Sequence, residues 1–236
     1  MDQPPHDGSQ SPQHRNFYGR RHGKTLRPSQ KAYLAEDLAA LTAGGISLAD
    51  NPARLALDVA ALTGNRPLWV EIGFGGGEHL VHMADQNPGI FILGCEPYVN
   101  GIAMLLGKIR RAGVTNLAIY PGDVRDLFEV LPDRAVARAF LNYPDPWPKA
   151  RHHRRRFVNP DYLVPLYRVL APGAEFRVAT DIADYVRQTL EQVPLAGFHR
   201  ADHPVDLAWS DWPSTRYEQK ALREGRPPHY LTFARP

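Results

Sequence analysis

An apolar strand followed by a glycine-rich turn constrains the fold of this chain more than any other feature. Residues 68–72, Leu-Trp-Val-Glu-Ile, form a predicted buried strand. Gly-Phe-Gly-Gly-Gly follows at 73–77, and a predicted helix runs from about Glu78 to Gln86. Such a turn lets a ligand approach the backbone closely, because glycine has no Cβ atom. We therefore expect an α/β protein with a Rossmann-like sheet.

The spacing of the glycines differs from that of dinucleotide-binding proteins. Glu78 stands where the third glycine of the Gly-x-Gly-x-x-Gly motif would be. A second predicted strand, 90–95, ends in Glu96, which lies 21 residues after Gly75. A carboxylate at that point of a nucleotide-binding unit can accept both hydroxyls of a ribose. The pattern thus favours a nucleoside ligand other than NAD.

Acidic residues stand at the carboxyl ends of three consecutive predicted strands, as Glu71, Glu96 and Asp123. This negative charge would repel a pyrophosphate, whereas S-adenosylmethionine carries a sulfonium and an ammonium and no phosphate. A methyl donor is favoured over NAD, and a dehydrogenase is disfavoured. The predicted donor-binding residues are Glu71, Gly73, Gly75, Glu96, Asp123 and Asp145. His79 and His82 have no third ligand in view, so we expect no metal site.

A proline-rich segment at 141–156 carries the next signal, Leu-Asn-Tyr-Pro-Asp-Pro-Trp-Pro-Lys-Ala-Arg-His-His-Arg-Arg-Arg. Its three prolines fix φ and push the preceding residues to extended geometry, which predicts a stiff loop. A strand predicted from Val136 to Leu141 would place Asp145 and Trp147 beyond its carboxyl end, where open sheets bind ligands. Taken alone, the segment is also compatible with a plain turn followed by a solvated charge cluster.

Positive charge is clustered rather than abundant, since the formal net charge is only +3. Residues 17–28 contain four Arg and Lys, two aromatics and no acid, a composition typical of single-stranded nucleic-acid contacts. Packing of Phe17 and Tyr18 against the protein's own domain is a compatible alternative. Clustered cations indicate a polyanionic partner.

Length and composition indicate one globular domain. We expect residues 1–28 to form a flexible basic arm, with 1–14 disordered, and 29–236 to form a single domain. Helical spacing is expected around Leu34, Leu38 and Leu41 and again near 53–62. No apolar run approaches the roughly 20 residues of a membrane span, and a single cysteine, Cys95, excludes an internal disulfide. A cytoplasmic location is the simplest expectation.

Together these residues resemble the bacterial tRNA (guanine-N7)-methyltransferases, which are class I enzymes dependent on S-adenosylmethionine. The resemblance covers roughly residues 65–235, and Pro-Asp-Pro-Trp-Pro-Lys-Ala-Arg-His-His-Arg-Arg-Arg at 144–156 is its most specific part. It implies a seven-stranded, mostly parallel sheet with an antiparallel last strand. It also implies that the enzyme methylates N7 of a guanine in the tRNA variable loop, guanine 46. Tyr143 and Tyr217 stand where phenylalanine is usual, and both keep an aromatic ring.

The resemblance also assigns roles to residues. It implies that Glu71, Glu96 and Asp123 line the donor site and that Asp145 lies at the reaction centre. It implies substrate contacts for Lys149, Asp181, Thr215, Arg216, Tyr217 and Glu218. We further predict that tRNA phosphates are held by Arg20, Arg21, Arg151, Arg154, Arg155 and Arg156.

Alternatives and partners complete the expectations. We expect tRNA to be the partner, and we expect neither membrane binding nor an obligatory protein partner. The protein is expected to be a monomer or a homodimer. Rival functions are a methyltransferase acting on another nucleobase or on protein, and a non-catalytic RNA-binding module with a Rossmann shell. Trp147 could stack on a base or anchor its loop in the core, and the anchor is favoured.

Overall fold

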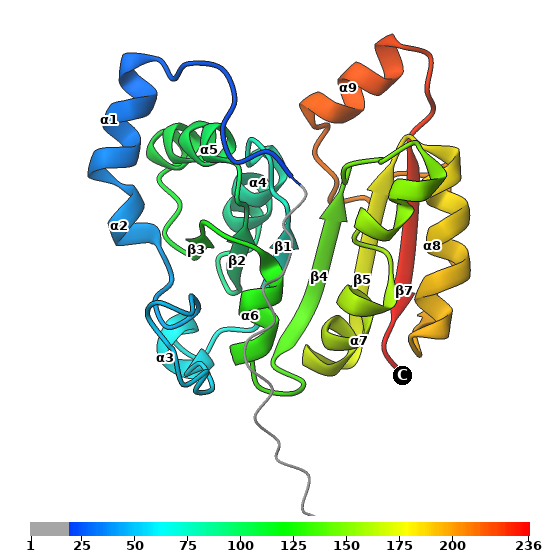
Figure 1. Cartoon of the computed structure of the whole chain (residues 1–236), viewed down its shortest axis with the longest axis horizontal. Coiled ribbons are helices and arrows are strands. Elements are labelled where there is room, and N and C mark those ends of the chain that lie inside the picture. Colours follow the sequence, from blue (N-terminus) through cyan, green and yellow to red (C-terminus); the bar gives the residue numbers. More distant parts are fainter. Residues whose placement is uncertain (1–18) are drawn as a thin grey trace, which may run out of the picture.

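The structure is a computed structural model that describes residues 19–236 (Figure 1). In this part of the chain seven strands form one sheet in the order β3-β2-β1-β4-β5-β7-β6. The strands are β1 Leu68–Ile72, β2 Phe91–Cys95, β3 Leu117–Tyr120, β4 Val136–Asn142, β5 Leu170–Thr180, β6 His199–Arg200 and β7 His229–Ala234. Strands β1 to β5 pair in parallel, and β7 is antiparallel to both of its neighbours. The predicted sheet, with its antiparallel last strand, is confirmed.

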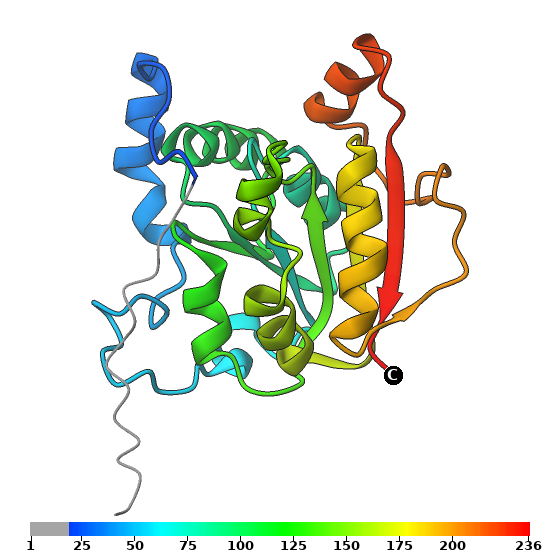
Figure 2. The same ribbon diagram turned by 45° about the vertical axis from the view of Figure 1, so that its right-hand side comes forward.

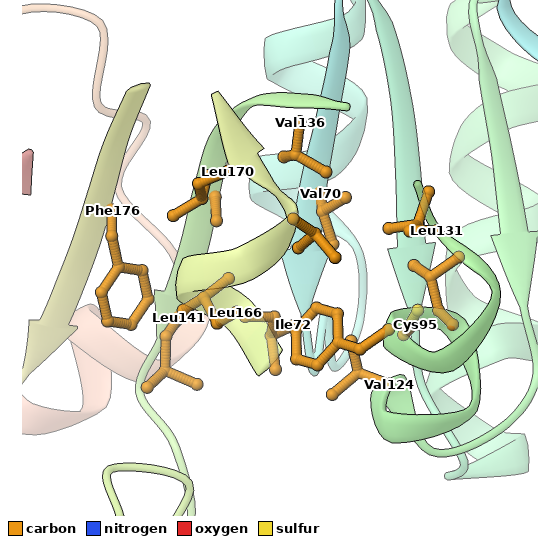
Figure 3. Close-up of a cluster of buried hydrophobic side chains, with 14 of the residues drawn as sticks. Val70, Ile72, Cys95, Val124, Leu131, Val136, Leu141, Leu166, Leu170 and Phe176 are labelled. Carbon is orange, nitrogen blue, oxygen red and sulfur yellow. The ribbon is translucent and has the colours of Figure 1, made fainter. Parts of the chain in front are cut away.

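Helices cover both faces of the sheet (Figure 2). On one face lie α4 Glu78–Gln86 and α5 Val99–Ala112, and on the other α6 Val124–Val130, α7 Pro160–Val169 and α8 Ala183–Leu195. Every residue of β1 and β2 is buried, which explains why their sequences, apart from Glu71, are apolar throughout rather than alternating. Figure 3 shows part of the larger core cluster, where Val70 and Ile72 pack near Val124 and Leu166.

The amino-terminal elements form a lead-in to the sheet, and the first of them packs on α5. They are α1 Pro28–Glu36, α2 Leu38–Leu41 and α3 Val59–Thr63. Tyr33 of α1 contacts the α5 glycine Gly107, and Arg110 of α5 pairs with Asp37 at 2.5 Å. The tail predicted to be disordered at 1–14, and Phe17 and Tyr18, lie outside the described residues.

Two local predictions are wrong. The helix expected over 53–62 forms only as α3. Asn51 binds backbone groups at Gly45 and Leu55, and these bonds hold the residues before α3 in a loop. The stiff loop expected over 141–156 is confirmed only for 143–149, since β4 extends through Asn142 and residues 150–155 form a 3-10 helix, η1 Ala150–Arg155.

The sheet topology fixes where a ligand can bind. Strands β2 and β3 lie on one side of β1, and β4 and β5 lie on the other, so the winding reverses between β1 and β4. In open α/β sheets, ligands bind at the carboxyl ends of the strands beside such a reversal. None of the helices within residues 19–236 is long and apolar enough to cross a membrane.

Candidate active site

A cavity of about 650 Å³ opens at the carboxyl ends of β1, β2 and β4. That volume is in the range of small-molecule and cofactor sites. Its walls come from the glycine turn, the strand ends, the 143–148 loop, the carboxyl-terminal region and the arm. The lining includes Gly73, Gly75, Glu96, Asp123, Asp145, Trp147, Arg155, Tyr217, Gly19 and Arg20. The sequence thus predicted many of the residues that the fold brings together here.

The glycine turn requires its glycines for two different reasons. Gly73, Gly75 and Gly77 all have positive φ, of 71°, 53° and 77°, a conformation that other residues adopt only at a cost. At Gly77 a Cβ atom would also lie 2.4 Å from Cδ1 of Leu105 on α5. The turn therefore packs so closely against α5 that position 77 has no room for a side chain.

Glu96 joins the turn to the second strand. One carboxylate oxygen accepts a hydrogen bond from the N–H of Gly75 at 2.8 Å, and the other accepts from the N–H of Tyr98 at 3.0 Å. Burial, with a smaller contribution from the charges of Asp145 and Glu71, raises the pKa of Glu96 to about 7 against the lowering effect of these two bonds. Glu96 therefore titrates near neutral pH.

The other two strand-end acids differ in position. Asp123 lines the cavity, and its carboxylate caps α6 by accepting from the N–H of Arg125 and pairs with that residue's guanidinium at 2.6 Å. Glu71 is buried beside the cavity, in a smaller pocket, where Oε2 lies 2.9 Å from Nδ1 of His79. The predicted carboxylates thus converge, but Glu71 does not line the main cavity.

The loop at 143–149 places Asp145 and Trp147 on the cavity wall. Tyr143 and Trp147 have positive φ, of 48° and 39°, strain of the kind that clusters at functional sites. Desolvation raises the pKa of Asp145 above its usual value, although the residue is exposed, and the positive charge of Arg20 opposes this rise. Asp145 and Glu96 therefore form an acidic side of the cavity.

Trp147 does not anchor its loop in the core, so that favoured prediction is wrong. Its ring is half-buried, lines the cavity, and contacts the ring of His152 edge-on with centroids 6.0 Å apart. The guanidinium of Arg155 lies 4.9 Å from the Trp147 ring centroid. The positive φ of Trp147 turns the chain here, and the ring remains available at the cavity surface.

The basic run divides into exposed and buried members. Lys149, Arg151 and Arg154 are exposed, as a phosphate contact requires. Arg156 is only 1% exposed, and its guanidinium binds Pro146, Trp147, Asp184 and Gln188 within the protein. The prediction that Arg156 contacts a tRNA phosphate is therefore wrong in this structure.

The arm lies against the amino terminus of α5. The N–H of Val99 donates to the carbonyl of Arg21 at 2.9 Å. Asn100 accepts from the N–H of Gly23 and donates to the carbonyl of Lys24, at 2.8 and 2.7 Å. These bonds hold the start of the described chain in place, and Gly19 and Arg20 line the cavity.

The carboxyl-terminal helix α9, Arg216–Arg223, closes another side of the cavity. Thr215 caps it by accepting from the N–H of Glu218 at 3.2 Å. Glu218 is buried and accepts from Nε1 of Trp212 at 2.9 Å and from the hydroxyl of Tyr230. Of the predicted substrate-binding residues here, Tyr217 lines the cavity, whereas Thr215 and Glu218 have roles inside the protein.

Some residues of the site were missed from the sequence. Arg226 donates from Nε to Asp181, a predicted substrate-binding residue, at 2.6 Å. The amide of Asn142 lies 3.5 Å from Glu71, and its Oδ1 is buried without a partner among the described residues. No local pattern marks either residue, because their partners lie 45 and 71 positions away.

Comparison with known proteins gives close matches over most of the chain. A family model described as "Putative methyltransferase" matches residues 65–231. The tRNA (guanine-N(7)-)-methyltransferase of Cereibacter sphaeroides is 70% identical over 224 residues, which cover 95% of this chain and 92% of the relative. The protein of the same name from Paracoccus denitrificans is 66% identical over 227 residues, covering 95% and 97%. That from Rhodospirillum rubrum is 44% identical, covering 93% and 87%.

Solved structures with a similar fold are more distant in sequence. The 16S rRNA methyltransferase KamB matches with a TM-score of 0.57 at 18% identity, covering 77% of this chain and 95% of that one. A variant of the 16S rRNA (adenine(1408)-N(1))-methyltransferase from Catenulisporales acidiphilia, solved with its cosubstrate SAM, has a TM-score of 0.50 at 17% identity and covers 75% and 90%. At these identities the similarity supports the fold.

Proposed function

The chain belongs to the tRNA (guanine-N(7)-)-methyltransferase family, and from this premise we propose that it methylates N7 of guanine 46 in the tRNA variable loop. The methyl donor is S-adenosylmethionine, and the second product is S-adenosylhomocysteine. The observation that carries the proposal is the meeting of Asp145 with Glu96 and the glycine turn in one cavity. A reaction centre and a nucleoside-binding wall therefore share one space.

The residues that line the cavity, as well as its size, fit S-adenosylmethionine. Gly73 and Gly75 leave room for close approach to the backbone, Glu96 would accept the ribose hydroxyls, and Asp123 adds negative charge. Acidic walls complement a sulfonium and an ammonium. When bound, the donor supplies an electrophilic methyl group. The ionised Glu96 holds the donor best, because a neutral carboxyl group is a poorer acceptor for two hydroxyls.

Asp145 is proposed as the catalytic residue. Guanine N7 has an available lone pair and loses no proton on methylation, so no general base is required. Placing N7 in line with the methyl group can contribute roughly 7 to 11 kcal/mol at best. The purine becomes cationic as the bond forms, and a fixed carboxylate at Asp145 stabilises that charge. Asp145 could also accept a hydrogen bond from the Watson-Crick edge of the base.

The surface around the cavity suits a tRNA backbone. Exposed cations on η1 and the arm lie beside the mouth, and they would hold phosphates. Trp147 and Tyr217 present aromatic rings to the cavity, where they can stack on a base. The proposed phosphate and substrate contacts are Arg20, Arg21, Lys149, Arg151, Arg154, Arg155, Asp181, Arg216 and Tyr217. Thr215 and Glu218, which are buried, hold α9 in place.

We also propose that the chain consists of one catalytic domain preceded by an arm. Residues 29–236 form the methyltransferase domain, and residues 1–28 form a basic arm that binds tRNA. The bonds of Arg21, Gly23 and Lys24 to the amino terminus of α5 support this arrangement, because they hold the start of the described chain at the cavity.

A direct test uses methyl-labelled S-adenosylmethionine and two unmodified tRNA transcripts that differ only at position 46. We expect label to enter the transcript with guanine 46 alone and to be released as N7-methylguanine. Label in both transcripts would keep the reaction and reject the position. Label in neither, with the donor still bound, would reject the tRNA substrate.

A further inference from the structure

Arg156 differs from the other cations of its run because its side chain is buried. At 1% exposure its guanidinium has left water, and a buried charge needs both a counter-charge and hydrogen-bond acceptors. We propose that Arg156 is a positioning residue that fixes the 143–149 loop, and with it Asp145, and that it does not bind tRNA. The catalytic consequence of this inference rests on the proposed function.

Two of its bonds hold the loop at its most strained point. Nε donates to the carbonyl of Pro146 at 2.7 Å, and Nη2 lies 3.4 Å from the carbonyl of Trp147. These carbonyls belong to the two peptide groups on either side of the Cα of Trp147, whose φ is +39°. Such a conformation persists only when its surroundings fix it. The planar guanidinium, with its fork of N–H donors, is suited to holding both groups at once.

The remaining bonds fasten the guanidinium to helix α8. Nη1 donates to Oε1 of Gln188 at 2.7 Å, and Nη2 pairs with Oδ2 of Asp184 at 2.8 Å. Between these two residues lies Tyr185, which is fully buried, and Arg156 lies 5.2 Å from its ring centroid. Gln188 also donates to the carbonyl of Val158. The loop is thus attached through Arg156 to a helix that is packed into the core.

The anchored carbonyl of Pro146 belongs to the residue directly after Asp145. A catalytic carboxylate acts best when its position is fixed before the substrate arrives. The bonds of Arg156 provide that fixation without any contact between Arg156 and the reacting atoms. Loss of the anchor should therefore reduce turnover rather than tRNA affinity.

Steady-state kinetics of Arg156→Lys test this directly. Lysine keeps the charge but cannot reproduce the forked bonds, so kcat should fall by about 10²-fold. The KM for tRNA and its salt dependence should stay at the wild-type values. Arg154→Gln, which removes an exposed cation of the same run, should instead raise the KM and weaken the salt dependence. Arg111→Gln, at an exposed site on α5, is the control for loss of charge. A rise in KM with unchanged kcat for Arg156→Lys would overturn the proposal.

A second variant and a second measurement keep the proposal testable if Arg156→Lys does not fold. Gln188→Met removes one of the acceptors of Arg156 and leaves the arginine and its other partners in place. It should lower kcat to a smaller extent, and it tests the anchor even if Arg156→Lys does not fold. Amide hydrogen exchange of peptides covering 143–149 should be faster in both variants. Unchanged exchange in both would refute the anchor whether or not the wild-type protein methylates tRNA. A wild-type protein without methyl transfer would refute the proposed function alone.

Discussion

The backbone N–H of Gly75 donates a 2.8 Å hydrogen bond to the carboxylate of Glu96, so the glycine turn and the second strand are joined through a single buried acid. The same carboxylate is the proposed ligand of the donor ribose. Its pKa is raised to about 7, chiefly by desolvation. Donor binding and the protonation of Glu96 are therefore linked in the neutral range.

Donor affinity should fall as the solution becomes acidic. The pKa of Glu96 in the folded protein lies above the ordinary value of 4.5. Between pH 4.5 and 7 the side chain is therefore mostly protonated in the folded protein, whereas it would be mostly ionised in an unfolded chain. Because the ionised form holds the ribose, the Kd for S-adenosylhomocysteine should rise about tenfold per pH unit below pH 7. Isothermal titration between pH 5.5 and 8.5 measures this, and a flat profile would contradict it.

Asp145→Ala should keep the fold and donor binding but lose most turnover. Removing one preorganised group that stabilises transition-state charge typically lowers kcat by about 10² to 10³-fold. Single-turnover methyl transfer measures the chemical step, and donor titration of the same variant supplies the control. Turnover close to that of the wild type would remove Asp145 from the reaction centre.

Replacement of Lys149, Arg151 and Arg154 by Gln should weaken the salt dependence of tRNA binding. Each lost phosphate contact should reduce the slope of log K against log salt by about 0.7 to 0.9. Binding measured from 50 to 300 mM salt gives the slope, and Arg111→Gln serves as the comparison for removal of one exposed charge at a distance from the cavity. The same slope in the triple variant would show that these exposed cations do not touch phosphates.

Gly77→Ala should destabilise the protein more than Gly64→Ala. Both glycines have positive φ, of 77° and 61°, but only at Gly77 would a Cβ atom meet Leu105. The φ cost of roughly 1–2 kcal/mol is common to both variants, and overpacking adds roughly 1–3 kcal/mol at Gly77 alone. Urea unfolding gives both free energies. Equal losses would mean that α5 moves away from the turn at little cost.

The sequence predicted those features that depend on local patterns. The glycine turn, the strands before it and after it, and the proline-rich loop are each specified within a few residues. The meeting of Glu96 and Asp145 followed from the rule that parallel strands end at one edge of the sheet. The resemblance to a known family added the antiparallel last strand.

The rest depends on contacts that form only in the folded chain. Arg154 and Arg156 are identical in type and two positions apart, and only the fold turns one outward and the other toward Gln188, 32 residues later. Glu71 looks like Glu96 in sequence, yet His79 engages it in a separate pocket. Asn51 prevents a helix where the apolar spacing favours one. In each case specific side-chain hydrogen bonds decide what the residue type and its spacing leave open.

The reversed direction of β7 has a practical consequence for work with the protein. β7 begins at His229, opposite Thr180 at the carboxyl end of β5, and ends at Ala234, opposite Glu175. The last strand thus carries the chain away from the cavity, as Figure 1 shows, whereas Gly19 lines the cavity itself. A dye or a solid support attached after β7 leaves the mouth open to a molecule as large as tRNA. The same attachment beside Gly19 would compete with it.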